Sequence, residues 1–151
     1  ALVAMLLDSN AFGEPRYASV ETRILLAPDQ YHWPLYVPPA SARLRGIARE
    51  WKPDILFVHT PDVAIVAGWA RLKVPSVQVI HCYWDASSGN PLKEAWRRAV
   101  ARWAFGRLGR RGILVARHME EDSSGYLDCP GNRFRCVENG VDLQTFSFAR
   151  R

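Results

Sequence analysis

The sequence has few cysteines, and they follow no pairing pattern. Cys82, Cys129 and Cys136 are odd in number and form no C-x-x-C pair, so we expect neither a disulfide framework nor a zinc site. We expect three buried thiols in a protein of the reducing cytoplasm. The sequence also lacks a long hydrophobic run. Its most apolar stretch, Ile55–Ala70, is broken by polar residues, whereas a membrane span needs about 20 largely apolar residues.

Several motifs that mark common enzyme classes are absent as well. There is no G-x-x-x-x-G-K-[ST] loop for a triphosphate and no G-x-G-x-x-G for a dinucleotide. Neither a G-x-S-x-G nucleophile turn nor an H-E-x-x-H zinc motif occurs. The four histidines are scattered without metal-ligand spacing, so we expect no metal site and no resident cofactor.

What is present is the composition of one globular domain. Of 151 residues, 48% are hydrophobic and 23% are charged, which excludes a disordered tail. Apolar runs predict strands, and 3.6-residue periodicity predicts helices that alternate with them from residue 41 onward. This order is typical of an α/β, Rossmann-like, mostly parallel sheet with helices on both faces. The predicted strands are 2–7, 20–26, 55–58, 74–80, 112–116 and 133–137; the predicted helices are 41–51, 61–72, 118–127 and a longer one that opens at Pro91.

Turn and cap residues support these boundaries. Thr60 precedes Pro61 and is predicted to cap the second helix, and Asn90 is predicted to cap the helix at Pro91. Four prolines make residues 28–39 irregular in this prediction. The aromatic residues of that segment either line a surface or cover the core; they are Tyr31, Trp33 and Tyr36.

Polar side chains follow three of the predicted strands. His59 ends the third strand, His81 ends the fourth, and Arg117 follows the fifth. Ligands of open parallel sheets bind beyond the carboxyl ends of the strands, where helix N-termini favour phosphate or carboxylate. The alternative is structural: each histidine is a lone hydrogen-bonded group at a strand end, and the arginine pairs with Glu120 or Glu121 on the surface.

The helix that opens at Pro91 is strongly basic. From residue 91 to residue 111 there are seven basic residues against one acidic residue, in a chain of net charge +5. Leu92, Trp96, Ala99, Val100 and Trp103 share one face, and Phe105 and Leu108 lie away from it. One interpretation is a core-facing helix with a solvated basic side. The other is attraction to an anionic membrane surface through Lys93, Arg97, Arg98 and Trp103. No nucleic-acid reading motif is present, so we do not expect nucleic acid as a partner.

Four segments in order resemble glycosyltransferase family 4, whose members are two-domain GT-B retaining enzymes. Residues 53–59 are similar to the family's "PDVVHAH" strand, and residues 74–81 to its "VPVVVTVH" strand. Residues 129–134 resemble the approach to the "NGVD…F" segment, which residues 137–146 resemble in turn. The likeness covers residues 41–148, with residues 1–40 fitting loosely.

The resemblance implies sugar transfer from a nucleotide-sugar donor to a sugar or lipid-linked acceptor, with retention and without a metal. It gives His81 a catalytic role at the donor sugar and pyrophosphate, and it places His59 near the cleft. His59 and Arg117, from their places after the strands, are the candidates for binding substrate or donor. Asn139, Gly140 and Asp142 correspond to the interdomain segment, where glycine tolerates the backbone change of domain closure. Residues 1–142 are then a Rossmann-like acceptor-side domain and residues 143–151 the start of the interdomain connection. A basic helix at the inner face of a membrane suits a lipid-linked acceptor.

The sequence departs from the family pattern in two places. Arg117 stands where the family usually has serine, and the family's first strand, glycine-rich loop and helix have no counterpart. We therefore expect an incomplete sheet with exposed edges, and no catalysis without a C-terminal donor domain. The alternative function is a non-catalytic Rossmann-like binding module with a basic membrane-surface helix.

Overall fold

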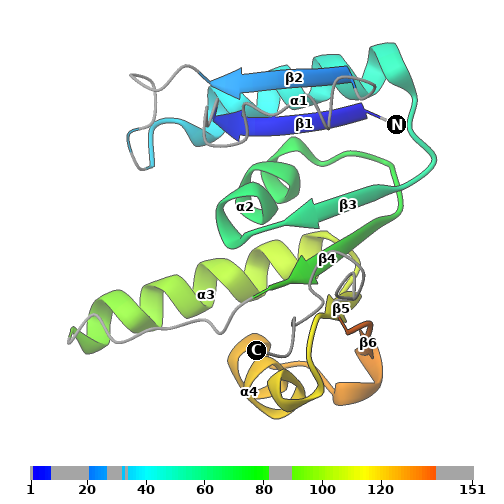
Figure 1. Ribbon diagram of the computed structural model, residues 1–151. Helices are drawn as coiled ribbons and strands as arrows, with labels where there is room; N and C mark the ends of the chain where they lie inside the picture. Colours follow the sequence, from blue (N-terminus) through cyan, green and yellow to red (C-terminus); the bar gives the residue numbers. More distant parts are fainter. Residues whose placement is uncertain (1, 8–20, 27–31, 33, 82–89, 139–151) are drawn as a thin grey trace, which may run out of the picture.

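A computed structural model describes residues 2–7, 21–26, 32, 34–81 and 90–138 of the chain (Figure 1). Strands and helices alternate along most of this length, as the sequence predicts. The strands are β1 (Leu2–Leu7), β2 (Glu21–Leu26), β3 (Leu56–His59), β4 (Ser76–Ile80), β5 (Gly112–Leu114) and β6 (Phe134–Cys136); the helices are α1 (Val37–Trp51), α2 (Pro61–Ala70), α3 (Pro91–Arg107) and α4 (Glu120–Leu127), with short 3-10 turns η4 (Arg117–Met119) and η5 (Gly131–Arg133).

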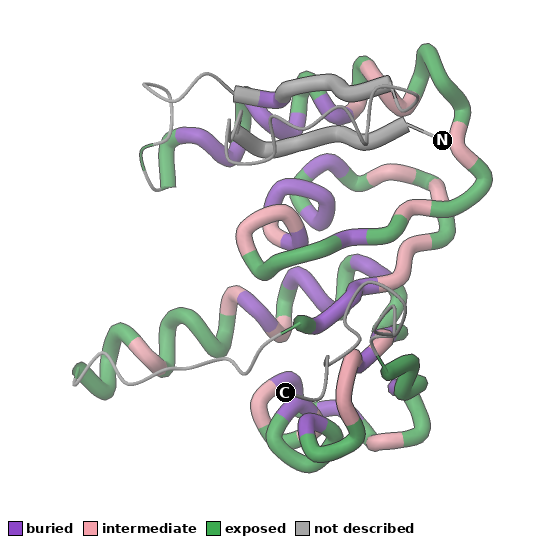
Figure 2. The backbone as a smooth tube through the Cα atoms, viewed as in Figure 1, coloured by how far each residue is buried: buried purple, intermediate pink, exposed green. Residues whose placement is uncertain are grey.

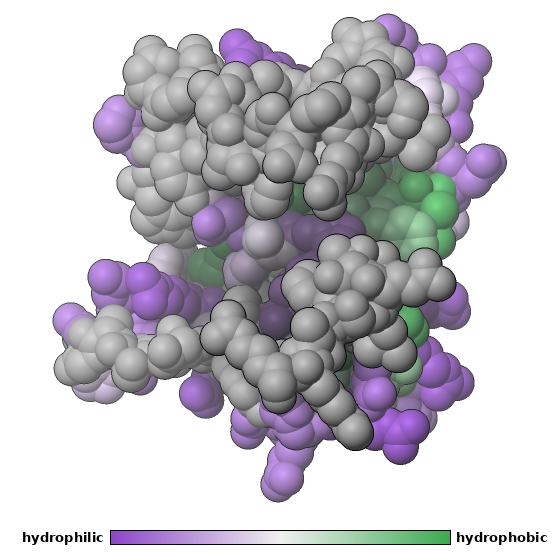
Figure 3. Space-filling view, viewed as in Figure 1, coloured by the Kyte–Doolittle hydropathy of each residue, from purple (hydrophilic) through white to green (hydrophobic). Residues whose placement is uncertain are grey.

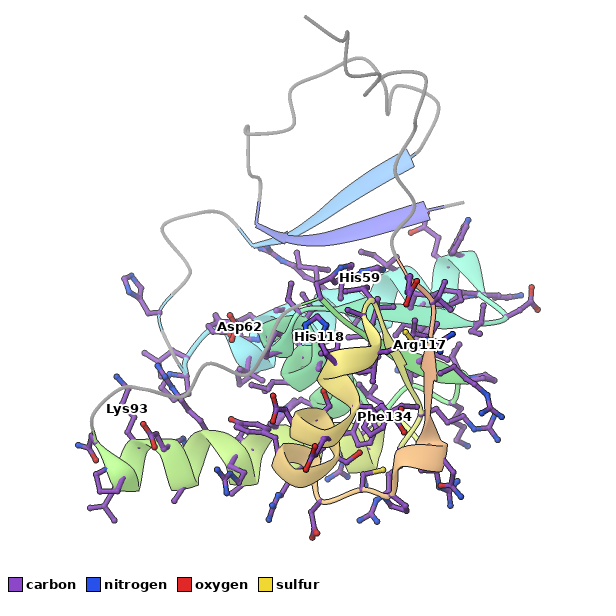
Figure 4. The ribbon with its side chains drawn as sticks, turned by 60° about the horizontal axis from the view of Figure 1, so that its bottom comes forward. His59, Asp62, Lys93, Arg117, His118 and Phe134 are labelled. Atoms are coloured by element: carbon purple, nitrogen blue, oxygen red, sulfur yellow. The ribbon has the colours of Figure 1, made fainter. Side chains whose placement is uncertain are left out.

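The strands form two parallel sheets rather than one. β1 pairs with β2, and β3, β4, β5 and β6 pair in that order, every pair being parallel. Figures 1 and 4 both place β1 between β2 and β3. In the described part of the chain, β1 and β3 therefore present facing edges that no ladder joins. The predicted α/β class with a parallel sheet is confirmed. The sequence predicts helices on both faces, but right-handed crossovers between strands paired in chain order put the described helices on one face of the larger sheet.

One face of the larger sheet carries the helices. The register aligns Val58 with Gln78 and Ile80 with Leu114, so these side chains share a face. All four are buried, Val58 beneath α1 and α2, and Ile80 and Leu114 beneath α3 and α4. The helices pack in chain order, α1 on α2, α2 on α3 and α3 on α4. Phe57 and His59, on the other face of β3, are both exposed.

The first helix begins earlier than predicted. It includes Pro38 and Pro39, which the sequence analysis assigned to an irregular segment. Prolines are tolerated in the first turn of a helix, because the N–H groups there have no partner within the helix. Tyr36, directly before α1, is buried in the core beside α2, so for this residue the core interpretation holds. Tyr31 and Trp33 lie outside the described residues.

The orientation of α3 differs from the predicted one. Its buried residues are Ala101, Ala104 and Phe105, followed by Leu108 just beyond its end, and not the stripe that begins at Leu92. Small residues face inward because α2 approaches closely: a methyl group added at Gly68 would lie 3.4 Å from the Ala104 backbone. The stripe of larger apolar residues points away from the sheet. The prediction of a core-facing Leu92–Trp103 face is therefore wrong.

Gly112 of β5 allows a close aromatic contact in the smaller core. The rings of Phe105 and Phe134 stack with centroids 5.7 Å apart, and both are buried. A methyl group at Gly112 would lie 2.7 Å from the Phe134 ring. The absence of a side chain at this position therefore sets how near β6 and α3 can come.

Candidate functional site

The carboxyl ends of β3 and β4 bring two histidines together. His59 aligns with Val79, and His81 follows Val79 by two residues, so both imidazoles project from the same face of the sheet. His59 Nδ1 lies 2.7 Å from His81 Nε2, and the rings stack with centroids 5.0 Å apart and planes at 24°. The sequence prediction that both histidines lie at one sheet edge is met, and the hydrogen bond between them is additional.

The bond leaves one nitrogen on each ring for a ligand. One of the bonded nitrogens carries the hydrogen, and the other accepts it. His59 Nε2 and His81 Nδ1 make no hydrogen bond to the described residues. Both side chains belong to exposed residues, so this face of the sheet can present an imidazole N–H to an anionic or hydroxylated ligand.

Two effects lower the pKa of His59 below its ordinary value of 6.5. Partial burial is the larger, because it disfavours the charged imidazolium, and the neighbouring His81 is the smaller. The His59 ring is therefore mainly neutral at pH 7, which lets it act as an orienting partner without adding a second positive charge.

This shift predicts how stability depends on pH. The unfolded chain binds a proton at His59 near pH 6.5, whereas the folded chain binds it only at lower pH, so acidification favours unfolding. The His59 contribution is present above pH 6.5 and is lost as the pH falls from that value through the lower pKa of the folded state. We expect His59→Asn to flatten this part of the stability profile in chemical denaturation between neutral and mildly acidic pH.

In NMR titrations, His81→Gln should raise the pKa of His59 without restoring 6.5, because burial persists.

The residue that links His59 to α2 has an unusual backbone. Thr60 has φ 66° and ψ 150°, a region that residues with a Cβ rarely occupy. It stands at the N-cap position of α2 as predicted, but its side chain makes no capping bond, so that part of the prediction is wrong. Pro61 and Asp62 begin the helix as expected. Thr60 thus directly follows His59, and its backbone conformation sets the direction in which the chain leaves β3.

Replacing Thr60 by glycine tests this strain. Relief of the strain contributes about 1–3 kcal/mol, and the added freedom of the unfolded chain offsets about 1 kcal/mol. We expect Thr60→Gly to raise the free energy of unfolding by about 1 kcal/mol in urea denaturation. A Thr60→Ala variant keeps the positive φ and should gain nothing; equal gains from both would show that the backbone is relaxed.

Arg117 lies at a different place along the same edge. It opens η4 after β5 and pairs with Glu138, which follows β6, at 3.6 Å from Nε to Oε1. The predicted partners Glu120 and Glu121 are wrong: they begin α4, where acidic side chains favour the helix N-terminus. With both side chains largely exposed, the pair adds about 0–1 kcal/mol. Figure 4 shows Arg117 and His118 on the same turn, and Lys93 at the remote end of α3.

Some of the remaining candidate residues lie in the described part of the chain, and others lie outside it. Asn139, Gly140, Asp142 and the domain boundary at residue 142 lie outside the described residues, as does Cys82. Cys129 is buried, and burial raises the pKa of its thiol, whereas Cys136 is exposed, contrary to the predicted buried thiol. Neither forms a disulfide with a described residue. No helix in the described residues is long and apolar enough to cross a membrane.

A parallel sheet layered with helices defines a Rossmann-like domain, and the paired imidazoles lie at the carboxyl ends of two of its strands. Residues 4–145 match the model of Glycosyltransferase Family 4, so the chain belongs to that family, and its function is of the glycosyltransferase type. This match confirms the family resemblance and the GT-B fold class drawn from the four sequence segments. No curated protein matches the chain.

Proposed function

We propose that this chain is the acceptor-side part of an enzyme that transfers a sugar from a nucleotide-sugar to an acceptor with retention of anomeric configuration. The observation that carries the proposal is the hydrogen-bonded pair His59–His81 at the carboxyl ends of two parallel strands in a family 4 domain. The nucleotide-sugar is a co-substrate in this scheme, and the reaction needs no resident cofactor.

The proposed chemistry assigns a donor role to His81. Transfer breaks the bond between the anomeric carbon and the phosphate oxygen and forms one from that carbon to an acceptor hydroxyl oxygen, whose proton passes to the departing phosphate. Negative charge grows on the departing pyrophosphate as the bond breaks. A preorganised N–H group directed at that charge, or at a hydroxyl of the sugar, stabilises the transition state. His81 Nδ1 is available for this because its Nε2 is bonded to His59.

His59 would then act as a positioning residue. If His59 Nδ1 donates to His81 Nε2, the neutral His81 ring must carry its own hydrogen on Nδ1. The lowered pKa of His59 favours its neutral ring, so His59 can orient His81 without placing a positive charge beside it. Arg117 is a further candidate for the phosphates, and its ion pair with Glu138 is exposed and weak enough to be replaced.

The proposed reaction needs more than this domain. The nucleotide-sugar would be held mainly by a C-terminal donor domain, and closure would occur at Asn139, Gly140 and Asp142. We propose that the 151 residues alone catalyse nothing. The proposed acceptor is a sugar or a lipid-linked sugar, and the proposed location is the cytoplasm, at the inner face of a membrane.

The test compares the 151-residue chain with the full-length protein that contains it, using a panel of nucleotide-sugars. Release of nucleoside diphosphate that depends on an added acceptor, by the full-length protein only, is the expected result. An NMR readout of the anomeric configuration of the product separates retention from inversion. If the full-length protein folds but binds and turns over no member of the panel, the proposal fails and a non-catalytic binding module takes its place.

A further inference from the structure

The N-terminal half of α3 has its apolar side turned away from the protein. Every residue from Pro91 to Ala99 is exposed except Glu94, which is half-buried. Leu92 is 81% exposed and Trp96 60% exposed, although they are among the largest apolar side chains of the helix. Figure 2 shows this half of α3 almost entirely in the colour of exposed residues, extending beyond α2.

Helical geometry places these apolar residues in a single stripe. At 100° per residue, Leu92, Trp96, Ala99 and Trp103 fall within about 60° of one another, opposite Ala101 and the other buried residues. The stripe continues onto α2, because Trp69 is exposed and meets the edge of the Trp103 ring at 6.1 Å between centroids. We call the four largest of these side chains the tryptophan stripe: Leu92, Trp96, Trp103 and Trp69.

Basic residues accompany the stripe and divide into two groups. Arg98 stacks on the Tyr126 ring at 5.3 Å, and Arg102 donates hydrogen bonds to the carbonyl oxygens of Tyr126 and Gly125, so these two hold α4. Lys93 and Arg97 form no ion pair with any described residue. Figure 3 shows hydrophilic side chains along α3 on the visible face.

These features match one kind of surface better than others. Tryptophan and leucine on one side of a helix, with unpaired lysine and arginine on its polar side, are the features of helices that lie in the interface of a bilayer. Tryptophan in particular favours the level of the lipid headgroups. A nucleic acid would use the charges but leaves Leu92 without a role, and a protein partner explains the apolar stripe but not the excess of cations.

We propose that the tryptophan stripe, with Lys93 and Arg97, docks this chain on the surface of an anionic lipid bilayer, with α3 lying in the interface. Leu92, Trp96 and Trp103 enter the headgroup region, and the two cations contact lipid phosphates. Arg98 is left out because it is engaged with Tyr126. Figure 1 shows β3, β4 and the N-terminal end of α3 directed to the same side of the domain, so the strand ends that carry His59 and His81 lie on the side from which α3 extends. The proposal does not depend on the proposed reaction.

The test is co-sedimentation of the chain with vesicles of phosphatidylcholine alone and of phosphatidylcholine with phosphatidylglycerol. We expect binding only to the anionic vesicles, weakened by salt. The double substitution Lys93→Gln with Arg97→Gln should weaken binding about 30-fold, because each lost cation removes its own attraction to the anionic surface. The matched control, Arg133→Gln at the end of η5 with Arg135→Gln on β6, removes the same charge from a distant exposed site and should change binding less than about 3-fold.

The apolar half of the proposal has its own variants. Leu92→Ala with Trp96→Ala should weaken binding at least about 30-fold without altering its salt dependence, because apolar contact with the headgroup region is lost. Trp51→Ala, at an exposed tryptophan of α1, should bind like the parent chain. All these sites are exposed, so circular dichroism should show unchanged folding.

Three results would overturn the proposal. One is equal binding to neutral and anionic vesicles. Another is binding to RNA as tight as that to vesicles and insensitive to Leu92→Ala with Trp96→Ala, which would assign the helix to nucleic acid. The third is failure to bind vesicles together with a dimer in solution that these two substitutions dissociate, since the stripe would then be covered by a second copy of the chain.

Discussion

In the proposed full-length transferase, His81→Ala is expected to lower kcat about 100-fold, the loss typical of removing one preorganised donor from a transition state. His81 is exposed beyond the end of β4 and takes no part in either hydrophobic core, so the free energy of unfolding should change little. Steady-state kinetics together with urea denaturation separate the two effects. Near-parental turnover would remove His81 from the mechanism even if the protein proves to be a transferase.

The neighbouring histidine gives a graded comparison. His59→Ala should lower kcat less than His81→Ala and should change the pH profile of kcat, because the tautomer of His81 is no longer fixed. His59→Gln, whose amide can still donate to His81 Nε2, should recover part of the loss. His32→Ala is the matched control: this exposed histidine lies before α1, and its contact with Tyr36 is through its backbone carbonyl, so activity should be unchanged.

Of the substitutions that add one methyl group to the sheet, Gly112→Ala is expected to be the most destabilising. The new carbon would lie 2.7 Å from the Phe134 ring, and this ring cannot withdraw because it is buried against Phe105. Overpacking of this kind costs about 3 kcal/mol. Thermal and urea denaturation should both show the loss, with the histidine site unchanged.

The same substitution elsewhere should have the opposite sign. Gly46 lies on the exposed side of α1 with no atom within 4 Å of the added methyl group. Gly46→Ala therefore improves helix propensity and should stabilise the chain by about 1 kcal/mol. Equal effects at the two glycines would mean that β5 and β6 have room to separate, contrary to the packing described here.

The alternation of elements was predictable because it depends on local patterns. The run of residues 55–58 is continuous and apolar, as buried parallel strands require, and prolines and caps mark where helices begin. Asn90 illustrates this well: its side chain accepts from the backbone N–H groups of Leu92 and Lys93, as its position before Pro91 predicts.

The inward face of α3 was not predictable in the same way. Periodicity identified an apolar stripe, but it could not show which stripe meets the sheet, because that depends on how closely α2 and α3 approach. Gly68 and Ala104 allow that approach and leave space for Phe105, whereas Trp96 has no space there. A helix with two apolar sides carries this ambiguity in any sequence analysis.

The histidine site was predictable in location but not in geometry. Strand ends fixed which edge His59 and His81 would share, while the bond between their rings depends on the parallel register that sets His59 beside Val79. The predicted partner of Arg117 was wrong for a similar reason. Glu120 is near in sequence, but Glu138 is brought close by the pairing of β5 with β6.

The separation of the strands into two sheets has a consequence for how the chain behaves in solution. β3 has a ladder partner on one side only among the described strands, so its outer amides lack the protection that both neighbours give to β4. Ile55, just before β3, and Phe57, within it, are both exposed. Such an edge is a template: an extended segment of complementary apolar pattern, supplied in cis or as a peptide, can complete the sheet by donor-strand complementation. Amide exchange at β3 should slow when that strand is in place, and concentrated chain without it should associate edge to edge.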